Sequence, residues 1–309
     1  MARASGIVLV RMKFSRDLQE AQLAAFSVHF DGSITTNHQL PVRILANTYE
    51  HMQRAIDRAY LIDKYGDVWK HARLKAADYQ EVNFLASYHR DGGVILDAFK
   101  VGADRIIDTV GNAIHSLYDR AAASGVGQYE SMSDQLVHRR QYVQGVGEAT
   151  QLFSTVLENP PAGWASAYSR RSVAKEIDQL ASQIIPDRYE GSTVEISLNG
   201  TYAHPIYIFN QETARRFHLL ASRRELGPAM IVRARIRALD RGNDTTEPGA
   251  KIENLDTNRE VILKLNSVSD CDELRPYHND QPVRIYVAPI IEAMGFDING
   301  GDLMFLGVV

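Results

Sequence analysis

The sequence of 309 residues contains one cysteine, Cys271. A single cysteine excludes an intramolecular disulfide and any metal site built from several cysteines, and a chain without disulfides is typical of a reducing compartment. The sequence also lacks an apolar run close to the ~20 residues of a membrane span, and residues 7–10 are too few for the core of a signal peptide. We therefore expect a soluble, cytoplasmic protein without a membrane partner.

The chain has no large excess of charge of either sign. Its 34 Lys and Arg residues nearly balance 38 Asp and Glu residues, and the formal net charge is -4. Proteins that bind nucleic acid or membrane surfaces through overall charge are usually strongly basic. Any site for a polyanion must therefore be local.

Common catalytic signatures are missing as well. The sequence holds no Gly-x-Ser-x-Gly, P-loop or His-Glu-x-x-His pattern, and no Gly-x-Gly-x-x-Gly after a strand. His29 and Asp31 share one face of a predicted strand and His38 follows, so a metal-dependent hydrolase or nuclease that uses these residues, or Asp91 of a hairpin turn, is the alternative hypothesis. No helical His-x-x-x-His pair accompanies them, and an Asp before Gly32 has a structural role in a turn. We predict neither a metal nor a cofactor.

The first part of the chain mixes strands and helices. A long amphipathic helix is predicted from Pro41 to Gly66, because apolar residues recur at helical spacing and glycine is a natural helix end. Helical periodicity returns at residue 101 and continues to about residue 185. Four segments show the period of two that is typical of strands: residues 6–14, 24–30, 82–88 and 94–99.

Beyond Gly191 the pattern becomes a series of short strands with one helix at about 211–222. Short strands joined by polar turns are typical of a small barrel or a strongly curved sheet. The change of period beside Pro186 and Gly191 predicts an α+β protein with a mixed α+β and helical domain over residues 1–190 and a small, β-rich, barrel-like domain over residues 191–309. The predicted strands are residues 193–198, 203–209, 229–239, 251–255, 259–265, 282–291 and 303–309.

The order of these elements resembles that of a group of bacterial proteins. FSVHFDG at residues 26–32, a long amphipathic helix, a strand, the DGG turn at 91–93, a strand and a helix look like the N-terminal part of bacterial proteins of unknown function, some found beside phage-defence genes. The small β domain after residue 229 is similar to the part that often follows. The resemblance covers about two thirds of the chain, implies an accessory role in phage defence and carries over no functional residue.

Arg233, Arg235 and Arg237 form the most informative pattern. Their alternation with Val232, Ala234 and Ile236 places three guanidiniums on one face of a strand and apolar side chains on the other. We predict that the arginines face solvent, because burial of unpaired guanidiniums costs on the order of several kcal/mol each.

Lys264, Arg284 and Tyr286 alternate in the same way on two further predicted strands. In register, they would join the arginines in a basic face with one aromatic ring, as single-stranded nucleic acid requires. The alternative interpretation is a solvated face whose arginines pair with acidic residues on neighbouring strands. The acidic residues available for such pairs are Glu195, Glu253 and Glu260.

A set of aromatic residues gathers near the predicted domain boundary. Such residues supply either a pocket or protein interface, or the packing between two domains, and we favour the packing. They are Trp164, Tyr168, Tyr189, Tyr202, Tyr207 and Phe209.

Together these patterns favour a non-catalytic binding or assembly protein over the hydrolase or nuclease. We expect the C-terminal β domain to bind nucleic acid, a nucleotide or a protein partner, and we expect the chain to associate with another protein or with a second copy of itself. The predicted binding residues are Arg233, Arg235, Arg237, Lys264, Arg284 and Tyr286.

Overall fold

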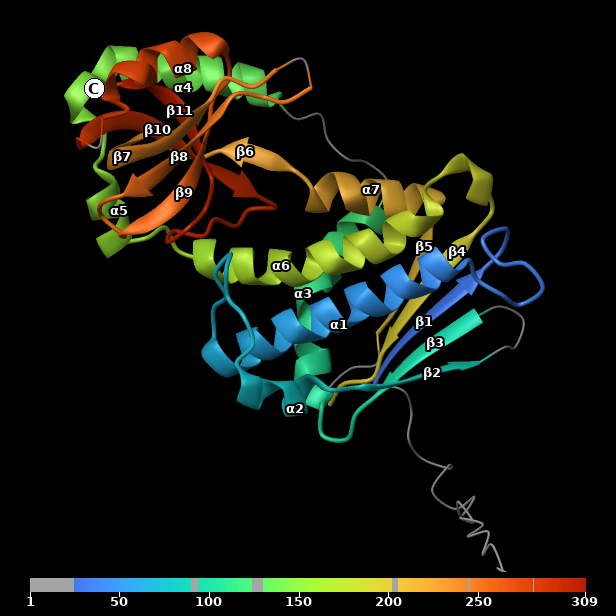
Figure 1. Ribbon diagram of the computed structural model, residues 1–309. Helices are drawn as coiled ribbons and strands as arrows, with labels where there is room; N and C mark the ends of the chain where they lie inside the picture. The colour runs from blue at the N-terminus through green and yellow to red at the C-terminus, as the bar shows by residue number, and fades with distance from the viewer. Residues whose placement is uncertain (1–24, 90–93, 124–129, 202–204, 244, 280) are drawn as a thin grey trace, which may run out of the picture.

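The computed structural model describes residues 25–89, 94–123, 130–201, 205–243, 245–279 and 281–309. They form two packed units, a helix-covered sheet and a barrel (Figure 1). The predicted α+β class with a barrel-like C-terminal part is confirmed.

The first unit contains a five-stranded antiparallel sheet in the order β2-β3-β1-β4-β5. Alternate residues of each central strand are buried toward the helices, as in β1, where three residues are fully buried. The opposite face carries mainly polar side chains. The strands are β1 (Phe26–Asp31), β2 (Leu85–His89), β3 (Val94–Phe99), β4 (Thr193–Leu198) and β5 (Ile206–Asn210).

Four helices pack together on one face of this sheet (Figure 1). The predicted long helix is α1, which is followed by Gly66, a capping residue with φ of 82° whose N–H donates to Ile62 O. A short helix, α2 (Tyr79–Val82), follows α1. The four helices are α1 (Val42–Tyr65), α3 (Asp104–Ala122), α6 (Trp164–Ala181) and α7 (Gln211–Ala221).

The second unit is a closed five-stranded barrel in the order β7-β8-β9-β11-β10, with β6 added beside β10. All neighbouring strands of the barrel are antiparallel except β9 and β11, and α8 (Val268–Leu274) joins β9 to β10. This connectivity is that of the OB fold. The strands are β6 (Arg224–Leu226), β7 (Met230–Asp240), β8 (Gly249–Asn254), β9 (Arg259–Lys264), β10 (Val283–Glu292) and β11 (Leu303–Val308).

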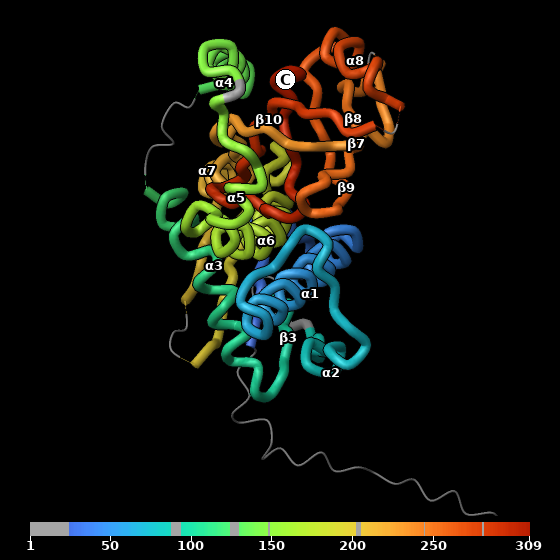
Figure 2. The backbone as a smooth tube through the Cα atoms, turned by 90° about the vertical axis from the view of Figure 1, so that its left-hand side faces the viewer, coloured from blue at the N-terminus to red at the C-terminus, as the bar shows by residue number. Residues whose placement is uncertain are grey.

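Two helices from the middle of the chain belong to the barrel. α4 (Met132–Val146) begins at the capping residue Ser131 and buries Leu136 and Val143 against the outer surface of β10 and β11. α5 (Phe153–Glu158) adds Phe153 to the barrel core. Figures 1 and 2 both place α6 between the barrel and α1, so α6 is the helix that meets both units.

The structure divides the chain differently from the predicted boundary at residue 190. β4, β5 and α7 follow that point but complete the first sheet and its helix layer, whereas α4 and α5 precede it but pack on the barrel. The change in hydrophobic period near residue 190 marks a change from helix to strand, and it does not mark the boundary between the two hydrophobic cores. Among the described residues, no helix is both long and apolar enough to cross a bilayer.

Candidate functional site

The arginine ladder, which we define as Arg233, Arg235 and Arg237 of β7, faces solvent as predicted. The three side chains are 62, 38 and 41% exposed, respectively. The apolar residues that alternate with them are buried in the barrel core. The predicted register of β7 is therefore confirmed.

Carboxylates accompany the whole ladder. Arg233 Nη2 lies 2.9 Å from Asp256 Oδ1, and Arg235 and Arg237 both pair with Glu253, one of the predicted partners. Exposed ion pairs of this kind contribute only about 0–1 kcal/mol each, so they orient the guanidiniums more than they stabilise the fold. They also neutralise much of the charge that a polyanion would meet.

The other three predicted residues do not extend the ladder into one basic face. Arg284 lies directly opposite Arg233 on β10. Tyr286 is 8% exposed because α4 covers this part of β10, so its ring offers no stacking plane to a base. Lys264 ends β9 opposite Gly249, at the far end of β7 from Arg233. The predicted continuous face is therefore corrected to a ladder, one neighbouring arginine and a separate lysine.

The residues of the alternative metal site do not form one cluster of ligands. Asp31 accepts a hydrogen bond from the Gly32 N–H at 2.7 Å, and His38 lies in a turn with φ of 57°. His29 lies on the polar face of the first sheet. Within the described ranges, no group of three His, Cys, Asp or Glu residues is placed to hold a metal ion. Asp91 lies outside the described residues.

The predicted aromatic set divides between the two units. Tyr207 and Phe209 belong to the core of the first unit, while Trp164 packs edge-to-face against Phe296 of the barrel with ring centroids 5.2 Å apart. Tyr202 lies outside the described residues. Trp164 therefore marks the place where α6 meets the barrel.

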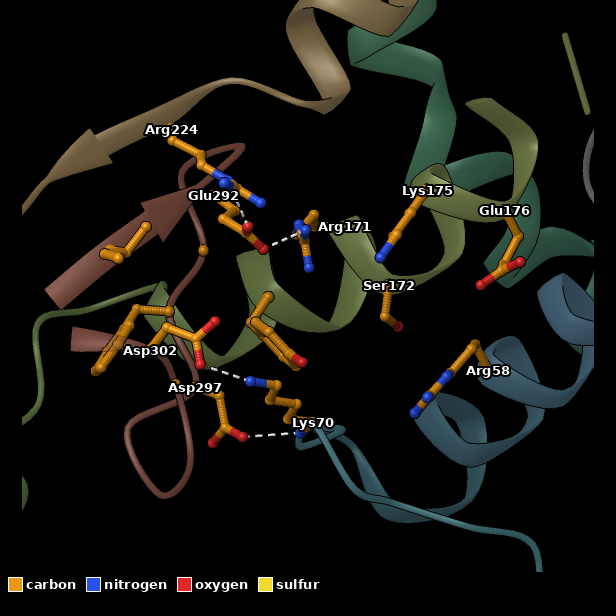
Figure 3. A pocket seen from close by; sticks show the side chains of 15 residues that line it. Arg58, Lys70, Arg171, Ser172, Lys175, Glu176, Arg224, Glu292, Asp297 and Asp302 are labelled. Carbon is orange, nitrogen blue, oxygen red and sulfur yellow. Dashed lines mark hydrogen bonds and ion pairs between the residues drawn. The ribbon is translucent and has the colours of Figure 1, made fainter. Parts of the chain in front are cut away.

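A pocket of about 280 Å³ lies at this meeting point, between α6, α1 and the loop 293–302 that joins β10 to β11 (Figure 3). Gly295 allows the close approach, because a Cβ atom at this position would lie 2.2 Å from Tyr168 N. We call it the junction pocket. Its lining residues are Arg58, Lys70, Tyr168, Arg171, Ser172, Lys175, Glu176, Arg224, Ile290, Glu292, Gly295, Phe296, Asp297, Gly301 and Asp302.

Lys70 ties the first unit to the barrel loop on one side of the pocket. Its N–H donates to Asp297 Oδ2 at 2.8 Å, and its Nζ donates to Asp302 Oδ1 at 2.6 Å. Asp297 is buried and also accepts a hydrogen bond from Asn299 N–H through Oδ1. These bonds fix the loop 293–302 against the segment that follows α1.

Glu292 lines another wall of the pocket and forms ion pairs with two arginines. Arg224 Nε lies 2.9 Å from Glu292 Oε1, and Arg171 pairs with Glu292 Oε2. One carboxylate therefore serves two guanidiniums. Arg171 Nε is buried without a hydrogen-bond partner, so this side chain retains an unused donor.

Arg58 and Lys175 are the cations of the pocket that lack carboxylate partners. Arg58 donates one hydrogen bond, to Ala72 O at 3.3 Å, and Lys175 has no hydrogen bond or ion pair within the described part of the chain. Figure 3 shows Lys175 directed from α6 toward the space beside Arg171, and Arg58 directed from α1 toward the chain segment that carries Lys70. Glu176, the carboxylate next to them, is occupied by His51, with Nδ1 and Oε2 2.8 Å apart.

Hydroxyl groups complement these cations. Burial raises the pKa of the Tyr168 hydroxyl to about 12, and the Asp297 carboxylate adds to the shift. Tyr168 is therefore neutral at physiological pH and can donate a hydrogen bond. The Ser172 hydroxyl also lines the pocket, but it donates its proton to Ser169 O at 2.7 Å, so the free hydroxyl donor is that of Tyr168. Guanidinium, ammonium and hydroxyl donors around one cavity are suited to phosphate or carboxylate groups, and they do not form a nucleophile with an adjacent general base.

Comparison with known proteins adds no relative: no family model, no curated protein and no solved structure matches the chain. The resemblance to bacterial proteins of unknown function, some found beside phage-defence genes, therefore stays a prediction.

Sequence reasoning did not find the junction pocket, because its charged residues come from α1, the segment after it, α6, β6 and the loop 293–302. No local spacing joins them. The available signal was the loop itself, where Gly295, Gly300 and Gly301 stand beside Asp297 and Asp302. Glycines permit the backbone of a loop to approach a neighbouring segment closely, and two acidic residues in such a loop indicate that cationic side chains lie nearby.

Proposed function

We propose that the protein is a non-catalytic binding protein that holds a phosphate-bearing ligand in the junction pocket. The observation that carries this proposal is the pair Arg58 and Lys175, two cations that face one cavity without carboxylate partners, next to the unused Nε donor of Arg171. A bound anion would give Arg58 and Lys175 the carboxylate-like partner that they lack, and it would lie beside the positive charge of Arg171.

The balance of charge in the pocket supports an anionic ligand. Five cationic and four acidic side chains line it, and three of those acids are already engaged by Lys70, Arg171 and Arg224 or by the backbone of the loop. Phosphate fits better than a single carboxylate, because its several oxygens can accept from guanidinium, ammonium and hydroxyl donors at the same time.

The position of the pocket in the fold is a second line of support. The loop 293–302 connects the fourth and fifth strands of the barrel, and OB folds commonly bind ligands beside this loop and the loop between the first two strands. Ligand sites also occur preferentially between packed units. Fold alone does not assign function, so the proposal depends on the cations.

Isothermal titration calorimetry with inorganic phosphate and pyrophosphate tests the proposal. Loss of one charge-assisted hydrogen bond costs about 1.5–3 kcal/mol, which is roughly 10- to 150-fold in Kd. We expect Arg58→Gln and Lys175→Gln each to weaken binding by at least about tenfold. Matched controls are Arg241→Gln and Lys251→Gln, which remove the same charges from exposed sites of the barrel. Equal affinity in all four variants, or no binding by the parent chain, would refute the site.

The arginine ladder is a second candidate surface, for an anionic polymer such as nucleic acid. The specific observation is that Arg233 and Arg284 lie directly opposite each other on neighbouring strands, so that four arginines stand on adjacent strands of one exposed surface. The carboxylates of Asp256 and Glu253 weigh against the ladder, and we therefore rank it below the junction pocket.

A further inference from the structure

A second cavity, of about 250 Å³, adjoins the junction pocket on its barrel side. Arg224, Ile290, Glu292 and Asp302 line both cavities, so the two cavities are adjacent and share part of their walls. We call it the α4 pocket. Its other lining residues are Met132, Ser133, Leu136, Glu247, Lys264, Leu265, Asn266 and Met304.

The α4 pocket offers an apolar wall that the junction pocket lacks. Met132 and Leu136 of α4 lie against Ile290 of β10 and Met304 of β11, in one hydrophobic cluster. Flexible methionine side chains adapt to flat, polarisable groups. This wall is suited to an uncharged ring.

The charges of the two cavities differ in sign. Two cationic and three acidic side chains line the α4 pocket, whereas cations outnumber acids in the junction pocket. The junction pocket is therefore the more favourable of the two cavities for a phosphate. A ligand with one anionic end and one neutral ring is therefore favoured with its anionic end in the junction pocket.

Polar groups for a base stand at the rim of the α4 pocket. Asn266 has no side-chain hydrogen bond within the described ranges, and Lys264 stands beside it at the end of β9. An amide presents both a donor and an acceptor, which matches the edge of a nucleobase. Lys264 was predicted as a binding residue with the ladder, and the structure gives it this different setting.

A carboxylate lies where the two cavities join. Asp302 uses Oδ1 for Lys70 and has no partner for Oδ2 within the described part of the chain. Sugar hydroxyl groups donate well to such an oxygen, as acidic residues do for ribose in dinucleotide sites. The join therefore has the chemistry for a ribose.

We infer that the ligand is a nucleoside phosphate, with the phosphate in the junction pocket, the sugar beside Asp302 and the base in the α4 pocket. This assignment rests on the proposed function, because it takes the phosphate site as given. It adds the class of ligand and the residues that recognise its neutral part.

Calorimetric titration of the full chain with inorganic phosphate, nucleosides and the four common nucleoside 5′-monophosphates tests the inference. We expect at least one monophosphate to bind ten times or more tightly than phosphate, and the matching nucleoside to bind more weakly than its monophosphate. A 5′-phosphorylated dinucleotide distinguishes a free nucleotide from the end of a nucleic acid strand. Tighter binding of either one supports the inference and identifies the source.

Variants separate this inference from the phosphate site. Met132→Glu places a charge at the apolar wall and should weaken monophosphate binding tenfold or more while phosphate binds as before. Val137→Glu makes the same change on the exposed side of α4 and is the matched control. Asn266→Ala tests the base edge at an exposed position, where the fold is not at risk.

Three results overturn the inference. If phosphate binds and Lys175→Gln weakens it, but no monophosphate binds more tightly than phosphate, the nucleoside assignment fails and the phosphate site stands. The same holds if Met132→Glu and Asn266→Ala both leave monophosphate affinity unchanged. If neither phosphate nor any monophosphate binds, both proposals fall.

Discussion

Gly295→Ala should loosen the contact between the barrel and α6. A Cβ atom at this position would lie 2.2 Å from Tyr168 N, 2.4 Å from Tyr168 Cα and 2.6 Å from Ala167 C. All three atoms belong to the backbone of a helix, which cannot shift as a side-chain end can. Overpacking of this kind costs about 1–3 kcal/mol, and we expect the upper end of that range.

Urea denaturation and thermal melting measure the effect. A loss of about 3 kcal/mol should lower the melting temperature by roughly 4–6 °C in a chain of this size. Because the displaced loop forms one wall of the junction pocket, the enclosure of the phosphate is lost and phosphate affinity should fall as well.

Gly145→Ala is the matched control, since a Cβ atom there meets nothing within 4 Å and the residue lies in α4. Alanine should stabilise that helix by up to about 1 kcal/mol. If Gly295→Ala leaves the free energy of unfolding unchanged, the loop and α6 do not touch in solution, and the junction pocket loses its basis.

Two further predictions concern charge. Burial raises the pKa of the Asp57 carboxyl, so its ionised form destabilises the fold above the folded pKa and the cost disappears below the unfolded value. Asp57→Asn should therefore raise the free energy of unfolding near pH 7 but not near pH 3, as urea denaturation at both values would measure, and an equal effect at both would contradict the assignment. Replacing all three ladder arginines by Gln should weaken binding of a single-stranded oligonucleotide at least tenfold and flatten its salt dependence, while the three exposed ion pairs together contribute no more than about 3 kcal/mol to stability. Unchanged binding in a filter or gel-shift assay would show that the ladder is a solvated face.

Local patterns predicted the elements well, for physical reasons. The long helix α1 and the outward register of Arg233, Arg235 and Arg237 follow from periodicities of 3.6 and 2, which a few consecutive residues determine. The barrel was predictable because short strands with polar turns close on themselves.

Contacts between distant segments were not predictable in the same way. Tyr286 alternates with buried residues, as a surface residue would. It is nevertheless buried by α4, a helix about 140 residues earlier in the chain, and the local pattern of β10 contains no sign of this contact. The boundary at residue 190 failed for a related reason, since β4 and β5 return to a sheet begun by β1. The junction pocket needs both kinds of contact, because Arg58, Lys175 and Asp302 meet only after the two units pack.

A crystal structure of the full chain grown with inorganic phosphate would show whether the junction pocket binds phosphate. We expect phosphate density in this pocket, with nitrogen atoms of Arg58, Arg171 and Lys175 about 2.7–2.9 Å from its oxygens. Phosphate bound on the arginine ladder while the junction pocket holds none, or Arg58 and Lys175 turned away from the cavity, would contradict it.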